Sequence, residues 1–150
     1  MHKKFRDEKQ CIFCDTRGVN VSKTKSKGKG FSRIFSIERS ESYVESIMDC
    51  GICNRKYKAM FGTSQEFFKN HLKFSELVLS DLVRLYPSIK RGLIIDAVIN
   101  NLIGVAQMSK KGQKFRPKEY NLVFEVKGKR GYLHCKKDKK DFKVISVNEV

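Results

Sequence analysis

The feature that most constrains this chain is a repeated cysteine spacing, C-I-F-C at residues 11–14 and C-G-I-C at residues 50–53. A two-residue gap lets a tight loop point both thiolates at one ion while backbone N–H groups face the sulfurs. Two such pairs supply four thiolates, which complete a tetrahedral shell and leave no position for water. The spacing therefore predicts one structural Zn²⁺ ion bound by Cys11, Cys14, Cys50 and Cys53.

Three other interpretations of the two pairs are weaker. Paired motifs can occur by chance without any metal. A redox-active dithiol needs a single CxxC at a helix start in a βαβ context, and no such context precedes either pair. An iron–sulfur cluster also uses four cysteines, but its usual spacings are absent here. The fifth cysteine, Cys135, has no CxxC partner, and we interpret it as a small strand residue or an exposed thiol.

The long separation of the two pairs leaves the type of zinc module open. A helix beginning in residues 55–61 would make a treble clef, whereas a hairpin at each pair would make a zinc ribbon. Between the pairs, lysine alternates with Ser, Thr or Gly over residues 21–30. Such a segment buries nothing, so we expect an exposed flexible loop. Residues 1–62 are thus predicted to form a tetracysteine zinc module with a basic loop.

The rest of the chain predicts an α+β protein. Residues 63–108 are expected to be helical, because Thr63 and Glu66 form a capping box, a break is expected near Ser75, and Pro87 ends the element. A second helix over residues 89–103, capped by Ser88, would be apolar on most of its circumference and therefore buried. Residues 109–150 are expected to be a basic linker and a β-hairpin turning at residues 127–131, followed by a further strand at 142–147. This order resembles a winged helix in outline.

The net charge of the chain points to a polyanionic partner. Lys and Arg number 32 against 16 Asp and Glu, which gives a formal charge of +16. Solubility requires a charge of only about 2 to 8 in a small domain, so the excess favours nucleic acid. A lysine-rich proteome is the alternative explanation. The longest apolar stretch, residues 93–105, is too short and too polar to span a bilayer, and no signal peptide is visible. We expect no membrane partner and an intracellular, reducing compartment, which is the nucleus if the source is eukaryotic.

Three basic clusters are the candidate nucleic-acid contacts. They are Lys23, Lys25, Lys27 and Lys29; then Arg55, Lys56 and Lys58; then Lys110, Lys111, Lys114, Arg116 and Lys118, with the hairpin-turn residues Lys127, Lys129 and Arg130. Lysine neutralises phosphates without reading sequence, whereas arginine on a rigid element reads base edges. Arg55 directly follows the second cysteine pair, so we predict that it reads sequence.

No catalytic constellation stands out, so we expect no enzymatic activity. An HNH-type nuclease would place a histidine near the cysteine pairs, but residues 15–49 contain none. A zinc-dependent deaminase needs H-x-E with P-C-x-x-C, and phosphate-binding loops need glycine patterns that are also missing. The sequence predicts a zinc-stabilised DNA-binding transcription factor or regulator. The alternatives are a protein-interaction or dimerisation module of the transcription machinery, including a homodimer, and an RNA-binding protein.

Overall fold

The computed structural model describes residues 11–14, 19–27, 30–32, 37–39, 44–61, 65–109, 119–139 and 141–150. Its strands are β1 (Val19–Lys27), β2 (Gly30–Ser32), β3 (Ile37–Arg39), β4 (Val44–Cys50), β5 (Arg55–Phe61), β6 (Leu72–Lys73), β7 (Leu102–Ser109), β8 (Glu119–Val126), β9 (Lys129–Asp138) and β10 (Asp141–Glu149). Its helices are α1 (Gln65–His71), α2 (Glu76–Leu85) and α3 (Ile94–Ile99), and η1 (Arg91–Leu93) is a 3₁₀ turn. The expected α+β class is confirmed.

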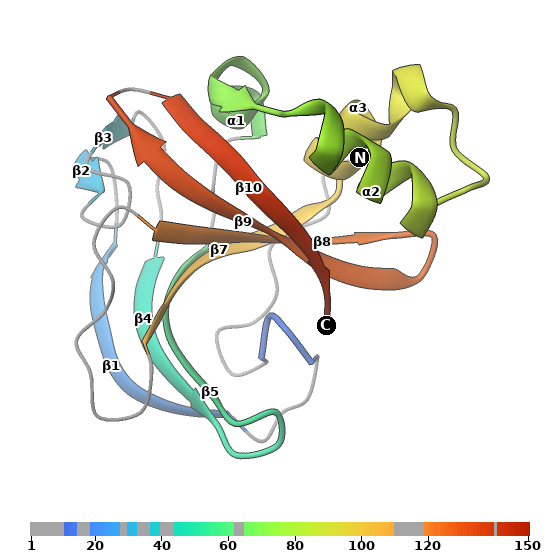
Figure 1. Ribbon diagram of the computed structural model, residues 1–150. Helices are drawn as coiled ribbons and strands as arrows, with labels where there is room; N and C mark the ends of the chain where they lie inside the picture. Colours follow the sequence, from blue (N-terminus) through green and yellow to red (C-terminus); the bar gives the residue numbers. More distant parts are fainter. Residues whose placement is uncertain are drawn as a thin grey trace.

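One sheet organises these elements. Its eight strands follow the order β1-β4-β5-β7-β8-β9-β10-β6, and β2 pairs with β3 separately. All neighbours in the large sheet are antiparallel except β10 and β6. In Figure 1 the sheet is strongly curved, with β1, β4 and β5 at one end and the helices lying over the face at the other. The predicted region boundary near residue 62 follows β5 and the one near residue 108 lies inside β7, so all three predicted regions contribute strands to this one sheet.

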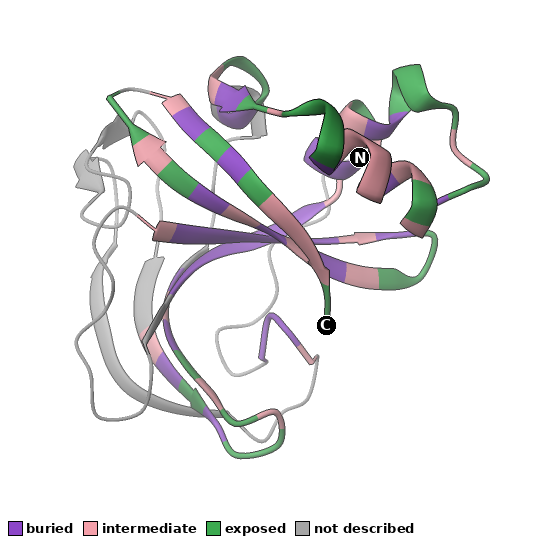
Figure 2. Cartoon of the chain, viewed as in Figure 1, coloured by how far each residue is buried: buried purple, intermediate pink, exposed green. Residues whose placement is uncertain are grey.

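The middle of the sheet is buried on both faces (Figure 2). On one face lies the helix-side core: Phe68, Leu72, Val78, Leu82, Tyr86, Ile94, Val98, Ile99, Leu102, Val105, Tyr120, Leu122, Phe124, Val126, Leu133, Cys135, Phe142 and Val144. On the other lies the cysteine-side core: Cys11, Ile12, Phe13, Met48, Cys50, Tyr57, Ala59, Ile103, Ala106 and Val123. Strand β8 contributes side chains to both cores, because successive side chains of a strand point to opposite faces.

The helix predicted over residues 89–103 is confirmed only in its middle part, residues 91–99. Only η1 and the short helix α3 form there, and Leu102 begins strand β7. Ser88 caps neither, since the N-cap position of η1 is Lys90 and no side chain bonds there. A continuous apolar run fits a buried helix and a strand buried on both faces equally well. Leu102 and Ile103 enter opposite cores, which a strand permits. The resemblance to a winged helix depended on that long second helix, so it is wrong.

The expected break near Ser75 is confirmed. Helix α1 ends at His71, and after β6 the Ser75 hydroxyl accepts the Val78 N–H at 3.3 Å as the N-cap of α2. Pro87 follows the end of α2 closely, as predicted. Thr63, the first residue of the proposed capping box, lies outside the described residues.

The lysine-rich segment is a strand rather than the predicted flexible loop over its described part. Residues 21–27 belong to β1, which pairs with β4 from Val19–Cys50 to Lys27–Val44. Lysine alternating with small polar residues has the period of a strand, and lysine is common on edge strands, where it discourages further pairing. Strand β1 is an edge of the large sheet.

The predicted C-terminal hairpin is confirmed, with a tighter turn. Lys127 and Gly128 alone connect β8 to β9, with φ angles of 55° and 75°. Two positive φ values are typical of the type I′ turn that suits the strand twist. Gly131 lies within β9, where a Cβ atom would come 2.9 Å from the Asn148 carbonyl oxygen. The predicted strand at residues 142–147 lies in β10.

Candidate metal centre

The four paired cysteines converge as the spacing predicts. Their sulfurs all lie within 4.8 Å of one another. Cys11 Sγ is 3.7 Å from Cys53 Sγ, and Cys14 Sγ is 3.6 Å from Cys50 Sγ. A tetrahedral ion with metal–sulfur bonds of about 2.3 Å separates its sulfurs by about 3.8 Å, whereas a disulfide bond is about 2.05 Å long. None of these four cysteines is in a disulfide bond. The cluster could therefore hold one metal ion.

The second cysteine pair forms the turn of the β4–β5 hairpin. Cys50 ends β4 and stands opposite Arg55, the first residue of β5. Asn54 closes the turn with a φ of 58°, a left-handed conformation that asparagine tolerates better than most residues. Because β5 is a strand, the helix that a treble clef would need at residues 55–61 is not formed.

The first cysteine pair is packed against the sheet by aromatic rings. Phe13 is fully buried, and its ring meets Tyr57 and Tyr132 edge-on at centroid distances of 5.0 and 5.5 Å. Edge-to-face contacts of this kind add to the stabilisation from burial. The pair is thus part of the cysteine-side core rather than an appended loop.

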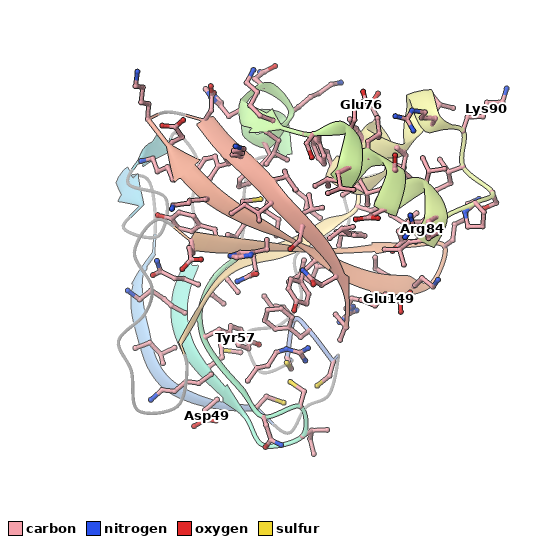
Figure 3. The ribbon with its side chains drawn as sticks, in the orientation of Figure 1. Asp49, Tyr57, Glu76, Arg84, Lys90 and Glu149 are labelled. Atoms are coloured by element: carbon pink, nitrogen blue, oxygen red, sulfur yellow. The ribbon has the colours of Figure 1, made fainter. Side chains whose placement is uncertain are left out.

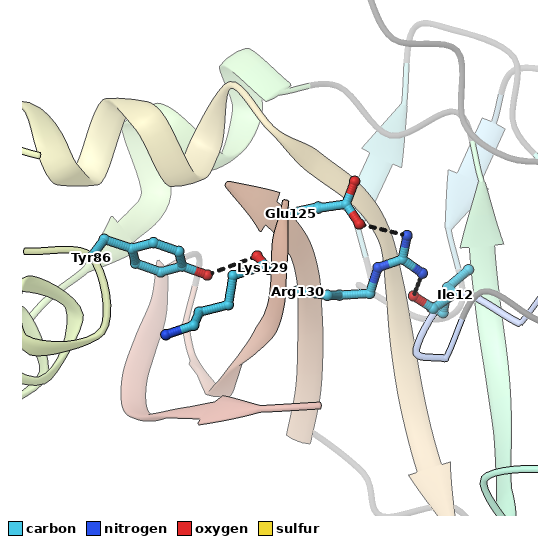
Figure 4. Close-up of polar contacts among 5 residues, drawn as sticks. All are labelled: Ile12, Tyr86, Glu125, Lys129 and Arg130. Atoms are coloured by element: carbon cyan, nitrogen blue, oxygen red, sulfur yellow. Dashed lines mark hydrogen bonds and ion pairs between the residues drawn. The ribbon is translucent and has the colours of Figure 1, made fainter. Parts of the chain in front are cut away.

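Arg130 fastens the same loop to the β8–β9 hairpin (Figure 4). Its Nη1 donates to the Ile12 carbonyl oxygen at 3.0 Å, and its Nη2 pairs with Glu125 at 3.1 Å. The Arg130 side chain is only 8% exposed and that of Glu125 is 24% exposed. Arg130, a predicted nucleic-acid contact, therefore has its partners within the protein itself.

Tyr57 connects β5 directly to the sulfur cluster. Its hydroxyl donates to Cys11 Sγ at 3.4 Å and accepts the Ile12 N–H at 3.1 Å. Figure 3 shows the side chain between the sheet and the group of sulfur atoms. Burial and its bond to Cys11 raise the pKa of Tyr57, so the hydroxyl keeps its proton and stays a donor. Such outer partners orient metal ligands.

Arg55 lies against the cluster rather than in open solvent. Its guanidinium stands 4.9 Å from the centroid of the Phe13 ring, and it bonds to Cys53. Burial disfavours its charge, but Cys53 and Tyr132 together outweigh burial and raise the pKa of Arg55. Four thiolates around a divalent ion carry excess negative charge, which this cation would partly balance. Its contacts within the protein are thus with Phe13 and Cys53, and a role in base reading stays a prediction.

The backbone of each loop favours thiolates at the first cysteine of its pair. Burial opposes ionisation of Cys50, but N–H groups of Cys53 and Ile52 outweigh it and lower the pKa of Cys50 to about 6. At Cys11 the equivalent bonds from Cys14 and Phe13 are weaker than burial, so its pKa is raised. Burial also raises the pKa of Cys53 to about 12. Metal binding would have to displace those protons.

The fifth cysteine lies apart from the cluster. Cys135 is a buried strand residue of the helix-side core, and its thiol donates to the Leu133 carbonyl at 3.8 Å. Burial raises the pKa of Cys135. Of the two interpretations of Cys135 from sequence, the buried strand residue is the correct one.

The sheet register brings parts of the basic clusters together. Lys23 of β1 stands opposite Ile47, which stands opposite Lys58 of β5. Lys56 stands opposite Ser109, the last residue of β7, from which the chain continues directly to Lys110. We call Lys23, Lys25, Lys56 and Lys58 the β1–β5 basic face; Glu45 and Asp49 of β4 share its rows.

The other predicted contacts are placed differently or not described. Lys129 bonds to the Leu85 carbonyl at 3.2 Å and to Glu149 at 3.3 Å. Lys27 and Lys25 lie in β1. The remaining candidates, Lys29, Lys110, Lys111, Lys114, Arg116 and Lys118, lie outside the described residues.

Sequence reasoning missed three features of this structure. The contacts of Tyr57 with Cys11 and of Arg130 with Ile12 have no local signal, because each joins residues distant in the chain. The third feature is the run K-K-D-K-K-D-F-K at residues 136–143, whose high content of charged residues is evident from the sequence. Its arrangement across strands depends on the register.

Comparison with protein-family models, with curated protein sequences and with solved structures finds no match to this chain. Among the described residues, no helix is long and apolar enough to cross a membrane. The exposed large apolar residues of the described chain are Ile52, Leu77, Leu93, Ile145 and Val150.

Replacing Tyr57 with Phe should weaken metal binding by about 10- to 100-fold, the usual cost of losing an outer partner of a ligand. The variant removes the donor to Cys11 and the acceptor of the Ile12 N–H, but keeps the ring that packs on Phe13. Competition with a chromophoric chelator measures the affinity. Tyr86→Phe is the matched control, because the Tyr86 hydroxyl donates to the Lys129 carbonyl, away from the cysteines. Equal affinities in both variants would exclude this role of Tyr57.

Proposed function

We propose that this chain is a zinc-stabilised, non-catalytic nucleic-acid-binding protein, a DNA-binding regulator that prefers DNA to RNA. The observation that carries the proposal is the register of β1, β4, β5 and β7. It puts Lys23 in one row with Lys58, and it puts Lys56 beside the point where the chain enters the basic segment 110–118. Basic side chains gathered on one face are the electrostatic footprint of phosphate binding.

Zinc is the ion that best suits the cluster. Soft thiolates in a tetrahedral set of four select zinc or iron, and a closed all-cysteine shell is typical of structural zinc. The second pair lies in a hairpin turn, and strand β1 follows the first pair, which supports the zinc-ribbon alternative. Metal analysis of purified protein should give one zinc ion per chain. Iron in its place, with visible absorbance, would contradict the zinc assignment while leaving the cysteine site intact.

The proposed role of zinc is to hold the basic face in shape. Lys56 follows the second cysteine pair by three residues, on the strand that the hairpin turn begins. The metal would therefore anchor β4 and β5, and with them the spacing between rows of lysine. Lysines positioned in this way bind the phosphate backbone and set orientation, but carry no sequence information themselves.

Salt dependence of binding tests the function. Affinity of the zinc-loaded chain for a short DNA duplex should fall linearly on a log–log plot against salt, by about 0.9 per phosphate contacted. The variant Lys23→Gln/Lys56→Gln/Lys58→Gln should lower this slope by about 2.7, because it removes three cations. Fluorescence anisotropy over a salt series measures both, and an RNA hairpin of equal length tests the preference for DNA.

A matched control removes three exposed cations on the helix-bearing side, none of them in a predicted cluster: Arg84→Gln/Lys90→Gln/Arg91→Gln. Its slope should stay near that of the unmodified chain. Weak binding of both DNA and RNA at low salt would contradict the proposed function and favour the protein-interaction alternative. Tighter binding of the RNA hairpin would favour an RNA-binding role instead.

A further inference from the structure

A row of three lysines crosses the end of the sheet farthest from the cysteines. Lys136 of β9 stands directly opposite Lys143 of β10, and Lys143 stands opposite Lys73 of β6. All three are exposed. Their chain neighbours Cys135, Phe142 and Leu72 are buried in the helix-side core, so the lysines lie on the other face of the sheet. We call Lys73, Lys136 and Lys143 the lysine ladder.

The ladder is electrostatically unfavourable in the protein alone. Like charges directly opposite across strands repel and destabilise a sheet, and here two successive strand pairs carry them. Within the part of the chain that the structure describes, no ion pair joins a carboxylate to any of the three lysines. An anion bound across the three lysines would remove this repulsion, which would explain why the sequence keeps them opposite one another.

The nearest carboxylates have other partners. Glu119 stands opposite Lys136, but its carboxylate lies 3.2 Å from His134 Nε2. Asp141 stands opposite Asp138, two pairs nearer the β9–β10 turn than Lys143. Its carboxylate lies 3.4 Å from His71 Nδ1. Glu119 and Asp141 thus pair with histidines rather than with the ladder.

We propose that the lysine ladder is a second contact surface for the phosphate backbone of the bound nucleic acid; this inference rests on the proposed function. Adjacent strands lie about 4.8 Å apart, so the three positions span roughly 10 Å. One DNA strand rises about 3.4 Å per phosphate, so this span matches about three phosphates. Flexible lysines suit backbone contact and carry no sequence preference.

The ladder is separate from the metal centre. Lys136 lies six positions along β9 from Arg130, the residue that holds the first cysteine loop, which is roughly 20 Å along an extended strand. Lys56 and Lys58 alternate with Tyr57 of the cysteine-side core, so they lie on the opposite face of the sheet from the ladder. A nucleic acid that contacted both surfaces would therefore have to pass round an edge of the sheet. Removing the ladder should leave metal content unchanged.

The test is the variant Lys73→Gln/Lys136→Gln/Lys143→Gln, assayed as zinc-loaded full chain with the same DNA duplex. The salt slope should fall by about 2.7, so the affinity lost between about 50 and 200 mM salt should shrink about 40-fold. Without DNA, the thermal midpoint should stay equal or rise, because the repulsion between opposite lysines is removed. A structural role would instead lower the midpoint and leave the slope unchanged.

The three triple variants separate the two proposals. A slope for the ladder variant no lower than that of the Arg84/Lys90/Arg91 control overturns the ladder. If the Lys23/Lys56/Lys58 variant alone loses slope, the proposed function stands and only the ladder fails. If the unmodified chain binds neither DNA nor RNA at low salt, both proposals fail together.

Discussion

Chelation of the metal is expected to unfold far more than the two cysteine loops. Cys11 and Cys50 are fully buried, and they share the cysteine-side core with Met48, Tyr57 and Val123. Strands β7 and β8 contribute to both cores, so loss of one face exposes the other. Structural zinc supplies about 10–16 kcal/mol of apparent binding free energy in zinc-finger peptides, which is as large as the total stability of a typical domain.

Hydrogen exchange and thermal unfolding of the zinc-loaded and chelated protein measure this effect. Chelation should remove protection from β4, β5 and the middle of β8 together, and lower the unfolding midpoint sharply. Cys50→Ser should have the same effect without any chelator. An apo protein that keeps its midpoint and its exchange protection would show that the cluster is not a structural metal centre.

Cys135→Ala is the matched control for the cysteine substitution. Cys135 is as deeply buried as Cys50 but belongs to the helix-side core. Its loss should cost about 1 kcal/mol, the ordinary size of a single-residue effect, and metal stoichiometry should remain one per chain. Loss of metal from this variant would contradict the assignment of ligands.

Replacing Arg130 with Met is expected to lower the free energy of unfolding by about 3–5 kcal/mol, the cost of breaking a buried charge pair. The change leaves the Glu125 carboxylate without its cation and the Ile12 carbonyl without this donor. Methionine keeps most of the aliphatic volume, so the loss reports on the guanidinium. Urea unfolding of the zinc-loaded protein measures the change.

Arg91→Met is the control, because Arg91 pairs with Glu76 at the surface, where the side chains are 50% and 85% exposed. An exposed pair of this kind contributes about 0–1 kcal/mol. The double variant Arg130→Met/Glu125→Gln should recover part of the loss, since no unpaired charge then remains buried. Equal costs for Arg130→Met and Arg91→Met would show that the Arg130 contact does not hold the cysteine loop in place.

The features predicted correctly from sequence are those set by neighbours in the chain. The CxxC spacing brings two thiolates to one point within four residues, so the clustering of Cys11, Cys14, Cys50 and Cys53 was predictable once two pairs were seen. The same holds for the break near Ser75 and for the hairpin turn within residues 127–131, although the cap at Ser75 and the two-residue length of the turn were not predicted. These geometries need no distant partner.

The features that only the tertiary structure decided depend on contacts between distant segments. Residues 102–109 form a strand because β5 and β8 flank them and a core lies on each face; their apolar run alone fits helix and strand equally well. Lysines 23 and 25 are in a strand because β4 offers a free edge. Register likewise aligned Lys73 with Lys136 and Lys143, and packing buried Arg130. Pairing and burial are properties of the assembled sheet, so no local pattern could specify them.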